Sequence, residues 1–336
     1  MNLIAFDIGG ANLKLADGRG LAISRPFPLW REPDALAEQL AEMLAAAGSS
    51  GTVVATMTGE LADCYRSKAE GVRRIVEALV EAAGKRLVAF YGTDGRLVGP
   101  DEAIAEPLRV AASNWHVLAS FAARYLTGAN GLLVDIGSTT CDLIPLIDRR
   151  PAARGATDPE RLACGELVYT GIERSPVCAV VQSLPWRGQP CRVAQELFAT
   201  TWDAYLTLGL VAEEPDACHT ADGRPATREL AHDRLARMVC ADRDLFSSAD
   251  AQSAAKAIYA AQLGLIESAA REVLAREPRI GESLVVSGCG EFLARLLAER
   301  LFADRPVISL AERLGPTASA VAPAHALAVL ARELLE

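Results

Sequence analysis

Several features that mark common classes of protein are missing from this chain of 336 residues. There is no block of lysine or arginine, and the formal net charge is -9, so we expect no nucleic-acid partner. No window approaches the ~20 consecutive apolar residues of a membrane helix, so we expect no membrane span. The first apolar strand begins at Leu3 without a basic segment before it, which predicts no secretory signal. These features favour a soluble, cytoplasmic protein.

Patterns for metal binding and disulfides are missing as well. The eight cysteines are scattered, with no Cys-x-x-Cys and no paired histidine, so neither a zinc site nor a disulfide framework is supported. We interpret the cysteines as reduced thiols, mostly in the core. Apolar residues, in contrast, make up 51% of the chain. That is enough for the cores of about two domains of roughly 150 residues each.

One phrase occurs twice in the sequence. LIAFDIGGANLKL (3–15) and LLVDIGSTTCDL (132–143) align with Asp7 against Asp135, and Ile, Gly and Leu then recur at matching positions. Each phrase begins with an apolar run that has the length and character of a buried strand. We therefore predict two strands that each end in an acid and a glycine and turn back as a hairpin.

The segments around the two phrases alternate between strand and helix patterns. The first phrase is followed by a returning strand, a helix ending at Gly48, strand 52–58, helix 67–85, strand 86–92 and helix 111–126. The second is followed by a polar excursion, strand 167–172, an irregular insertion at about 184–250 with short helical pieces, helix 251–276, strand 283–288, helix 291–301, strand 306–310 and a closing helix near 318–335. This order predicts partly parallel sheets covered by helices. We place the two lobes at residues 1–127 and 128–336.

Hairpin turns of this composition are suited to binding phosphate. Small residues let an anion approach the outward-pointing amide groups. We therefore expect phosphate contacts at Gly9, Gly10 and Asn12 in the first turn and at Gly137, Ser138, Thr139 and Thr140 in the second. Asp7 and Asp135 could hold Mg²⁺, and Lys14 could contact a phosphate oxygen. Two turns facing each other across a cleft would grip one polyphosphate, although for a single copy an ordinary strand end explains the pattern equally well.

Three further groups of residues are candidates for the site. VVSGCGEF (285–292) places Gly288 and Gly290 between a strand and a helix, where a nucleotide or another phosphate compound could bind. Glu60 and Asp63 follow strand 52–58, at the end where an open sheet binds ligands, and a capping pair for the next helix is the alternative. Asn114 could contact substrate, and a simple helix start is the alternative.

These motifs resemble those of a known superfamily. DIGGANLK, VDIGSTTCDL and VVSGCGEF are similar to the two phosphate motifs and the adenosine motif of acetate and sugar kinases, Hsp70 and actin. The resemblance implies an α/β fold with two ribonuclease-H-like lobes and a central cleft. Phosphate motif 1 lies in residues 1–127, and phosphate motif 2 and the adenosine-like motif (283–291) lie in residues 128–336.

A narrower resemblance rests on TMTGELADCY (56–65), EGVRRIV (70–76), ASNWHVLASF, DIGSTTCDLIP, GELVYTGI and TADGRPATRE. These segments resemble the hydantoinase/oxoprolinase-like family, also described as tetrahydromethanopterin-linked C1-transfer pathway proteins. Archaeal members join a furan-methyl diphosphate to the phenol of gamma-glutamyltyramine in methanofuran biosynthesis and release pyrophosphate. Such a reaction implies small-molecule diphosphate and phenol substrates, with Mg²⁺.

The implied reaction needs a leaving-group site and a base. Asp7, Lys14 and the turn amides would neutralise the departing diphosphate. The phenol has an unperturbed pKa of roughly 10, so a carboxylate should accept its proton, and Asp142 is the first candidate, with Glu60 and Asp63 behind it. Two alternatives stay open at the level of sequence. One is an ATP-dependent small-molecule kinase or ATPase, and the other is a non-catalytic nucleotide-binding regulator.

Overall fold

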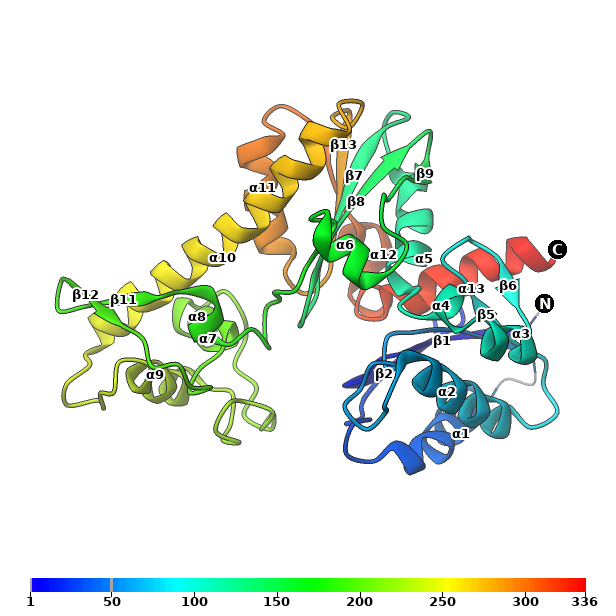
Figure 1. Cartoon of the computed structure of the whole chain (residues 1–336), viewed down its shortest axis with the longest axis horizontal. Coiled ribbons are helices and arrows are strands. Elements are labelled where there is room, and N and C mark those ends of the chain that lie inside the picture. The colour runs from blue at the N-terminus through cyan, green and yellow to red at the C-terminus, as the bar shows by residue number, and fades with distance from the viewer. Residues whose placement is uncertain (1, 49–50) are drawn as a thin grey trace.

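The computed structural model describes residues 2–48 and 51–336 and shows two α/β lobes with a side domain (Figure 1). The first sheet has the order β3-β2-β1-β4-β5-β6. Its strands are β1 (Leu3–Ile8), β2 (Asn12–Ala16), β3 (Ala22–Pro26), β4 (Thr52–Met57), β5 (Val88–Tyr91) and β6 (Leu97–Val98). The chain first makes two antiparallel turns, and β4 and β5 then run parallel to β1.

Helices α1 (Leu36–Ala47) and α2 (Lys68–Ala83) cover one face of this sheet. The buried side of α1 is the predicted apolar stripe, and Gly48 ends the helix in the left-handed conformation with φ 62°. Ser67 caps α2 by accepting a hydrogen bond from the Glu70 amide. Short helices α3 (Pro100–Ala105) and α4 (Pro107–Val110) complete this layer.

The second sheet repeats the first. Its order is β10-β8-β7-β13-β14, with β9 (Arg150–Pro151) paired to β8. The strands are β7 (Gly131–Ile136), β8 (Cys141–Ile147), β10 (Leu167–Val168), β13 (Ser283–Ser287) and β14 (Val307–Ser309). As in the first sheet, two antiparallel pairs precede two parallel ones. The duplicated architecture predicted from the repeated phrase is confirmed, although the third strand covers only two residues of the predicted 167–172.

Two helices lie between the sheets. Helices α5 (Asn114–Ala122) and α13 (Ala322–Leu335) pack against each other, and the apolar core around them includes residues from both sheets. α13 contacts β1, β2 and β4, so the C-terminal segment lies on the first sheet although the proposed boundary assigned it to the second lobe. Helix α12 (Leu310–Ser319), which precedes it, was not predicted. In the described part of the chain, no single helix is long and apolar enough to cross a membrane, and only the bent pair α12 and α13, at 100°, passes that test together.

The insertion predicted at about 184–250, irregular with short helical pieces, forms a side domain of short helices and a hairpin. Its elements are the hairpin β11 (Ser183–Trp186) and β12 (Gln189–Arg192), α8 (Thr201–Leu208) and α9 (Arg228–Arg237), and α7 (Val177–Val180) comes just before them. These elements share an apolar core with the first half of the 29-residue helix α10 (Ser248–Arg276). The apolar residues of this core come in short runs, which is why periodicity did not reveal it.

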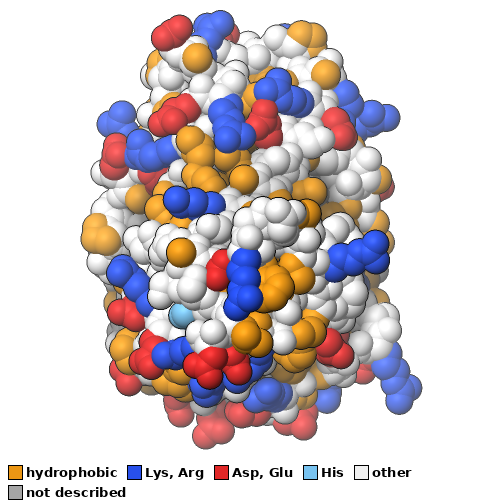
Figure 2. Space-filling model, turned by 90° about the vertical axis from the view of Figure 1, so that its left-hand side faces the viewer, with side chains coloured by type: hydrophobic (Ala, Val, Ile, Leu, Met, Phe, Trp, Pro, Cys, Tyr) orange, Lys and Arg blue, Asp and Glu red, His pale blue; other side chains and the backbone are white. Residues whose placement is uncertain are grey.

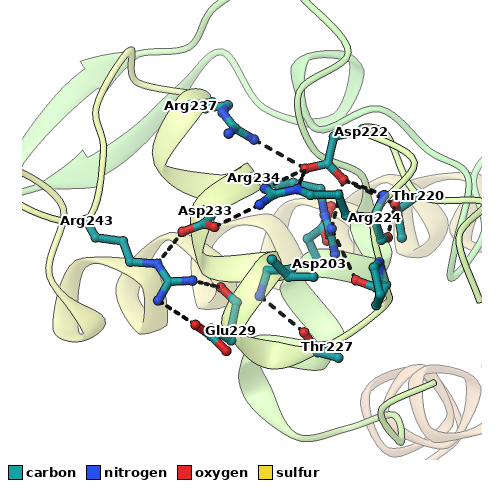
Figure 3. Close-up of polar contacts among 12 residues, drawn as sticks. Asp203, Thr220, Asp222, Arg224, Thr227, Glu229, Asp233, Arg234, Arg237 and Arg243 are labelled. Atoms are coloured by element: carbon teal, nitrogen blue, oxygen red, sulfur yellow. Dashed lines mark hydrogen bonds and ion pairs between the residues drawn. The ribbon is translucent and has the colours of Figure 1, made fainter. Parts of the chain in front are cut away.

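Ion pairs hold the polar part of the side domain together (Figure 3). Arg234 is fully buried and donates to Asp203 at 2.6 Å and to Asp222 at 3.1 Å. Asp222 also accepts from Arg224 and Arg237. The surface on this side of the molecule accordingly shows acidic and basic side chains interspersed with scattered apolar ones (Figure 2).

Candidate active site between the lobes

The two hairpin turns have the same backbone geometry. The Gly9 amide donates to the Asn12 carbonyl at 3.0 Å, and the Gly137 amide donates to the Thr140 carbonyl at 2.9 Å. Behind the turns, Asp7 is paired across the strands with Lys14, and Asp135 is paired with Asp142. Because cross-strand partners lie on the same face of a sheet, each hairpin presents two charged side chains on one side.

The amides that remain open to a ligand differ from those expected. Gly9 and Gly137 were assigned to phosphate, but their amides close the turns. Within residues 2–48 and 51–336, the next two amides of each turn donate to no protein acceptor; these belong to Gly10, Ala11, Ser138 and Thr139. A Cβ atom on Gly10 would meet nothing within 4 Å, so the space above the first turn is open.

The first hairpin holds a buried acid beside a lysine. Lys14 Nζ lies 4.0 Å from Asp7 Oδ2, and Asp7 Oδ1 is buried with no hydrogen-bond partner among the described residues. Burial raises the pKa of Asp7, and Lys14 opposes this shift. A carboxylate oxygen held in this way is suited to accept a cation or a water molecule that arrives with a ligand.

The second hairpin faces the first. Burial raises the pKa of Asp135 to about 6, repulsion from Asp142 adds to the effect, and a hydrogen bond from Ser287 opposes it. Lys14 and Asp7 of the first lobe also shift the pKa of Asp135, in opposite directions. The two motifs that the repeated phrase encodes are therefore close enough to interact, as the sequence predicted.

Asp142 is less free than its proposed role as a base requires. Arg161 Nη2 lies 2.5 Å from Asp142 Oδ1, and the Arg161 guanidinium stacks over the Trp115 ring with its carbon 4.2 Å from the ring centroid. Arg161 is 1% exposed and lies in α6 (Asp158–Ala163). The sequence analysis did not identify Arg161, because nothing in the polar excursion that contains it indicates that it turns back toward β8.

Glu60 has the properties that Asp142 lacks. Its side chain is 1% exposed, Oε1 lies 3.7 Å from Lys68 Nζ, and Oε2 has no partner among the described residues. Burial is the main cause that raises the pKa of Glu60 to about 7. Lys68 makes a closer contact across the lobes, to Asp158 Oδ2 at 2.7 Å. Glu60 is therefore a buried carboxylate without a close ion-pair partner, and its pKa lies near neutral pH.

The other two substrate candidates are placed less favourably. Asp63 is exposed in the segment between β4 and α2. The side-chain oxygen of Asn114 accepts a hydrogen bond from the Trp115 amide at 2.7 Å, at the first turn of α5. The structure thus favours the helix-start interpretation for Asn114.

Gly288 and Gly290, which follow β13, pack closely against the backbone of Ile136. Gly288 has φ +89°, and a Cβ there would lie 2.1 Å from the Ile136 carbonyl oxygen. The Gly290 amide donates to the same carbonyl at 2.8 Å, so this amide is occupied, and a phosphate contact at Gly290 stays a prediction. The first lobe has the same support, because the Thr58 and Gly59 amides donate to the Ile8 carbonyl.

The described residues contain no group of three or more histidine, cysteine, aspartate or glutamate side chains that could hold a metal alone. Mg²⁺ does not need one, because it usually binds through one or two carboxylates together with water and substrate phosphates. The buried, unpartnered Asp7 Oδ1 and the facing Asp135 fit such a site.

Comparison with known proteins identifies the family of this chain. The sequence pattern of the family described as Hydantoinase/oxoprolinase matches residues 51–333. The chain belongs to this family. A family-wide label does not define the reaction, so individual relatives are more informative.

Two curated relatives carry the same name, (4-{4-[2-(gamma-L-glutamylamino)ethyl]phenoxymethyl}furan-2-yl)methanamine synthase. The protein from Methanocaldococcus jannaschii is 34% identical over 99% of this chain and 98% of its own length. The protein from Methanococcus vannielii is 31% identical over 61% of this chain and 92% of its own length. Among solved structures, nucleotide-free acetone carboxylase has a TM-score of 0.51 at 14% identity, and the match covers 95% of this chain and 51% of that chain. This likeness concerns the fold alone, and the two-lobed order of strands agrees with the fold class predicted from the sequence.

Proposed function

We propose that this protein is a transferase that forms the aryl ether of a methanofuran-type cofactor. It would join a furan-methyl diphosphate to the phenol of gamma-glutamyltyramine and release pyrophosphate. The observation that carries the proposal is the 34% identity to the Methanocaldococcus jannaschii synthase over 99% of the chain, since the name of that enzyme describes a phenoxymethyl furan. The facing pair of hairpin turns supports it, because a diphosphate needs donors on two sides.

The diphosphate is placed between the turns. The open amides of Gly10 and Ala11 would donate to it from one side, and those of Ser138 and Thr139 from the other. Lys14 supplies a positive charge beside the first turn. We expect the hydroxyl groups of Ser138, Thr139 and Thr140 to add hydrogen bonds to the phosphate oxygens.

Asp7 and Asp135 are the residues that would hold Mg²⁺. When bound, this ion neutralises charge on the leaving diphosphate. Burial raises the pKa values of both carboxyl groups, so a cation near them removes an unfavourable interaction.

Glu60 is our candidate for the base, in place of Asp142. A base needs an oxygen that is free to accept a proton and a pKa near the working pH, and Glu60 combines an unpartnered oxygen with a pKa of about 7. The carboxylate of Asp142 is occupied by Arg161. Because Glu60 is buried, the phenol can reach it only when the lobes separate near the Lys68–Asp158 contact.

The bonds and charges balance in this scheme. The phenol oxygen forms a bond to the furan-methyl carbon, and the bond from that carbon to the diphosphate oxygen breaks. The electron pair leaves with pyrophosphate, and the phenolic proton passes to the Glu60 carboxylate. No oxidant or reductant is required.

The test measures pyrophosphate released by purified protein with Mg²⁺ and both organic substrates, beside a reaction that contains ATP alone. We expect release only when both organic substrates are present. Lys14→Ala should lower the rate by roughly 10- to 150-fold, the range expected from a lost hydrogen bond to a charged group. Lys85→Ala, which changes an exposed lysine after α2, should leave the rate unchanged. ATP turnover without ether formation would refute the transferase and support a kinase or ATPase.

A further inference from the structure

Among the protein side chains described so far, the acidic groups of the site outnumber the cations that are free to bind a ligand. Asp7 and Asp135 face it with Lys14 as the nearby cation. The other two cations of the cleft are engaged, since Arg161 pairs with Asp142 and Lys68 pairs with Asp158. A diphosphate would add further negative charge, so its binding calls for another positive group.

Arg174 is an arginine that is not paired with an acidic side chain among the described residues. It follows β10, is exposed, and makes no ion pair with any described residue. Its amide donates to the Ser138 carbonyl at 3.1 Å, which fixes its backbone against the second turn. The neighbouring Glu173 is held elsewhere, because His219 Nε2 lies 3.5 Å from its carboxylate.

The side chain of Arg174 reaches the other lobe. Its guanidinium carbon lies 5.4 Å from the centroid of the Trp30 ring. The residue before Trp30 is bound to the first turn, because the Leu29 amide donates to the Gly10 carbonyl at 3.0 Å. Arg174 is thus anchored at one phosphate turn, while its charge lies beside the segment anchored at the other.

The contact between Arg174 and Trp30 joins equivalent segments of the two duplicated lobes. Gly10 and Ser138 occupy matching positions in the repeated phrase. Leu29 donates to the carbonyl of the first, and Arg174 donates to the carbonyl of the second. The chain after the third strand therefore supports the turn in both lobes, and only the second lobe places an arginine there.

We propose that Arg174 binds the diphosphate from the second lobe, as the counterpart of Lys14 in the first, and that stacking on Trp30 holds its guanidinium beside the turns. The proposal rests on the proposed function for the identity of the diphosphate. A planar guanidinium presents a fixed pair of donors to two phosphate oxygens, whereas a lysine acts as a compact point charge. Cation–π stacking orients the group without neutralising it.

Binding of pyrophosphate with Mg²⁺, measured by calorimetry, tests the proposal without either organic substrate. We expect Arg174→Ala to weaken binding tenfold or more and Arg174→Lys to give an intermediate loss. Arg192→Ala is the matched control, because Arg192 is also exposed but lies on β12 in the side domain. Failure of the wild-type protein to bind pyrophosphate, or binding by Arg174→Ala within twofold of wild type, would overturn the proposal.

Kinetics separate this role from a structural one. Arg174→Ala should raise KM for the diphosphate ester and leave KM for the phenol and the melting temperature unchanged. An equal rise in both KM values would contradict a direct phosphate contact. Parallel titrations compare ADP with pyrophosphate. Tighter binding of pyrophosphate supports a site for a simple diphosphate group, and tighter binding of ADP would indicate a nucleotide site. A wild-type protein that binds pyrophosphate but forms no ether would refute the proposed function and leave the role of Arg174 intact.

Discussion

At the scale of single residues, the charge of the cleft depends on very few side chains. The chain has four lysines; Lys14 contacts Asp7 within the first hairpin, and Lys68 contacts Asp158 across the lobes. Lys68 is shared between two carboxylates, with Asp158 at 2.7 Å and Glu60 at 3.7 Å. Glu60 is therefore left with weak compensation for its burial, and this makes it both a candidate base and a source of pH-dependent stability.

Glu60 should make the folded state less stable as pH rises. Its folded pKa of about 7 exceeds the ordinary value of 4.5, so the folded state binds more protons between these values. The free energy of unfolding, compared with Glu60→Gln, should fall by about 3 kcal/mol from pH 4.5 to above pH 7. Urea unfolding of both proteins across this range measures the difference. A difference that stays constant with pH would contradict the assignment.

Glycine substitutions separate structural glycines from those that leave room for a ligand. Gly288→Ala places a Cβ 2.1 Å from the Ile136 oxygen at a positive φ, and we expect a loss of about 2–4 kcal/mol in unfolding free energy. Gly10→Ala meets nothing within 4 Å and should change stability by less than about 0.5 kcal/mol. Chemical denaturation measures both, and equal losses would show that Gly10 is also required by the fold.

At the scale of elements, the sequence predicted the structural features that depend on residues close together in the chain. Both hairpins, the Gly48 helix end and the apolar stripes of α1 and α2 follow from local patterns, and the structure confirms them. Contacts between residues that are far apart in the sequence left no local pattern from which they could be predicted. Arg161 is 19 positions from Asp142, and Lys68 is 90 positions from Asp158. The Arg161–Asp142 pair and the cross-lobe ion pair therefore could not be predicted.

The packed core of the predicted insertion gave no signal for a related reason. It is assembled from short apolar runs on several elements, and the polar loops of the side domain are held by ion pairs between residues far apart in the sequence. Within TADGRPATRE (220–229), the Gly223 amide donates to the Thr220 carbonyl and closes a turn. What the pattern did not show is that Asp222 is a centre of the arginine network in Figure 3.

Removing Arg234 should open the side domain. Arg234→Met leaves Asp203 buried without its charged partner, at a cost of about 3–5 kcal/mol. Arg237→Met is the control, because Arg237 contacts the same Asp222 from an exposed position and should cost less than about 1 kcal/mol. Hydrogen exchange should speed up in residues 209–227 for the first variant alone. Unchanged exchange in Arg234→Met would contradict the role of the network.

At the scale of the whole molecule, the two lobes share an apolar core that includes residues from both sheets. Helices α5 and α13 join the sheets, and the repeated hairpins face each other at the strand ends. The side domain extends from the second lobe beside α10, which leaves the first lobe without a counterpart (Figure 1). The fold supplies two turns with open amides, and the proposed function places a diphosphate between them.

The position of bond cleavage tests this account most directly. The protein is incubated with Mg²⁺, the furan-methyl diphosphate and gamma-glutamyltyramine carrying ¹⁸O in the phenol, and both products are weighed by mass spectrometry. We predict that the ether retains the ¹⁸O and that the pyrophosphate is unlabelled, because the phenol oxygen attacks the furan-methyl carbon. Label in a phosphate product, or the absence of the ether, would contradict the account.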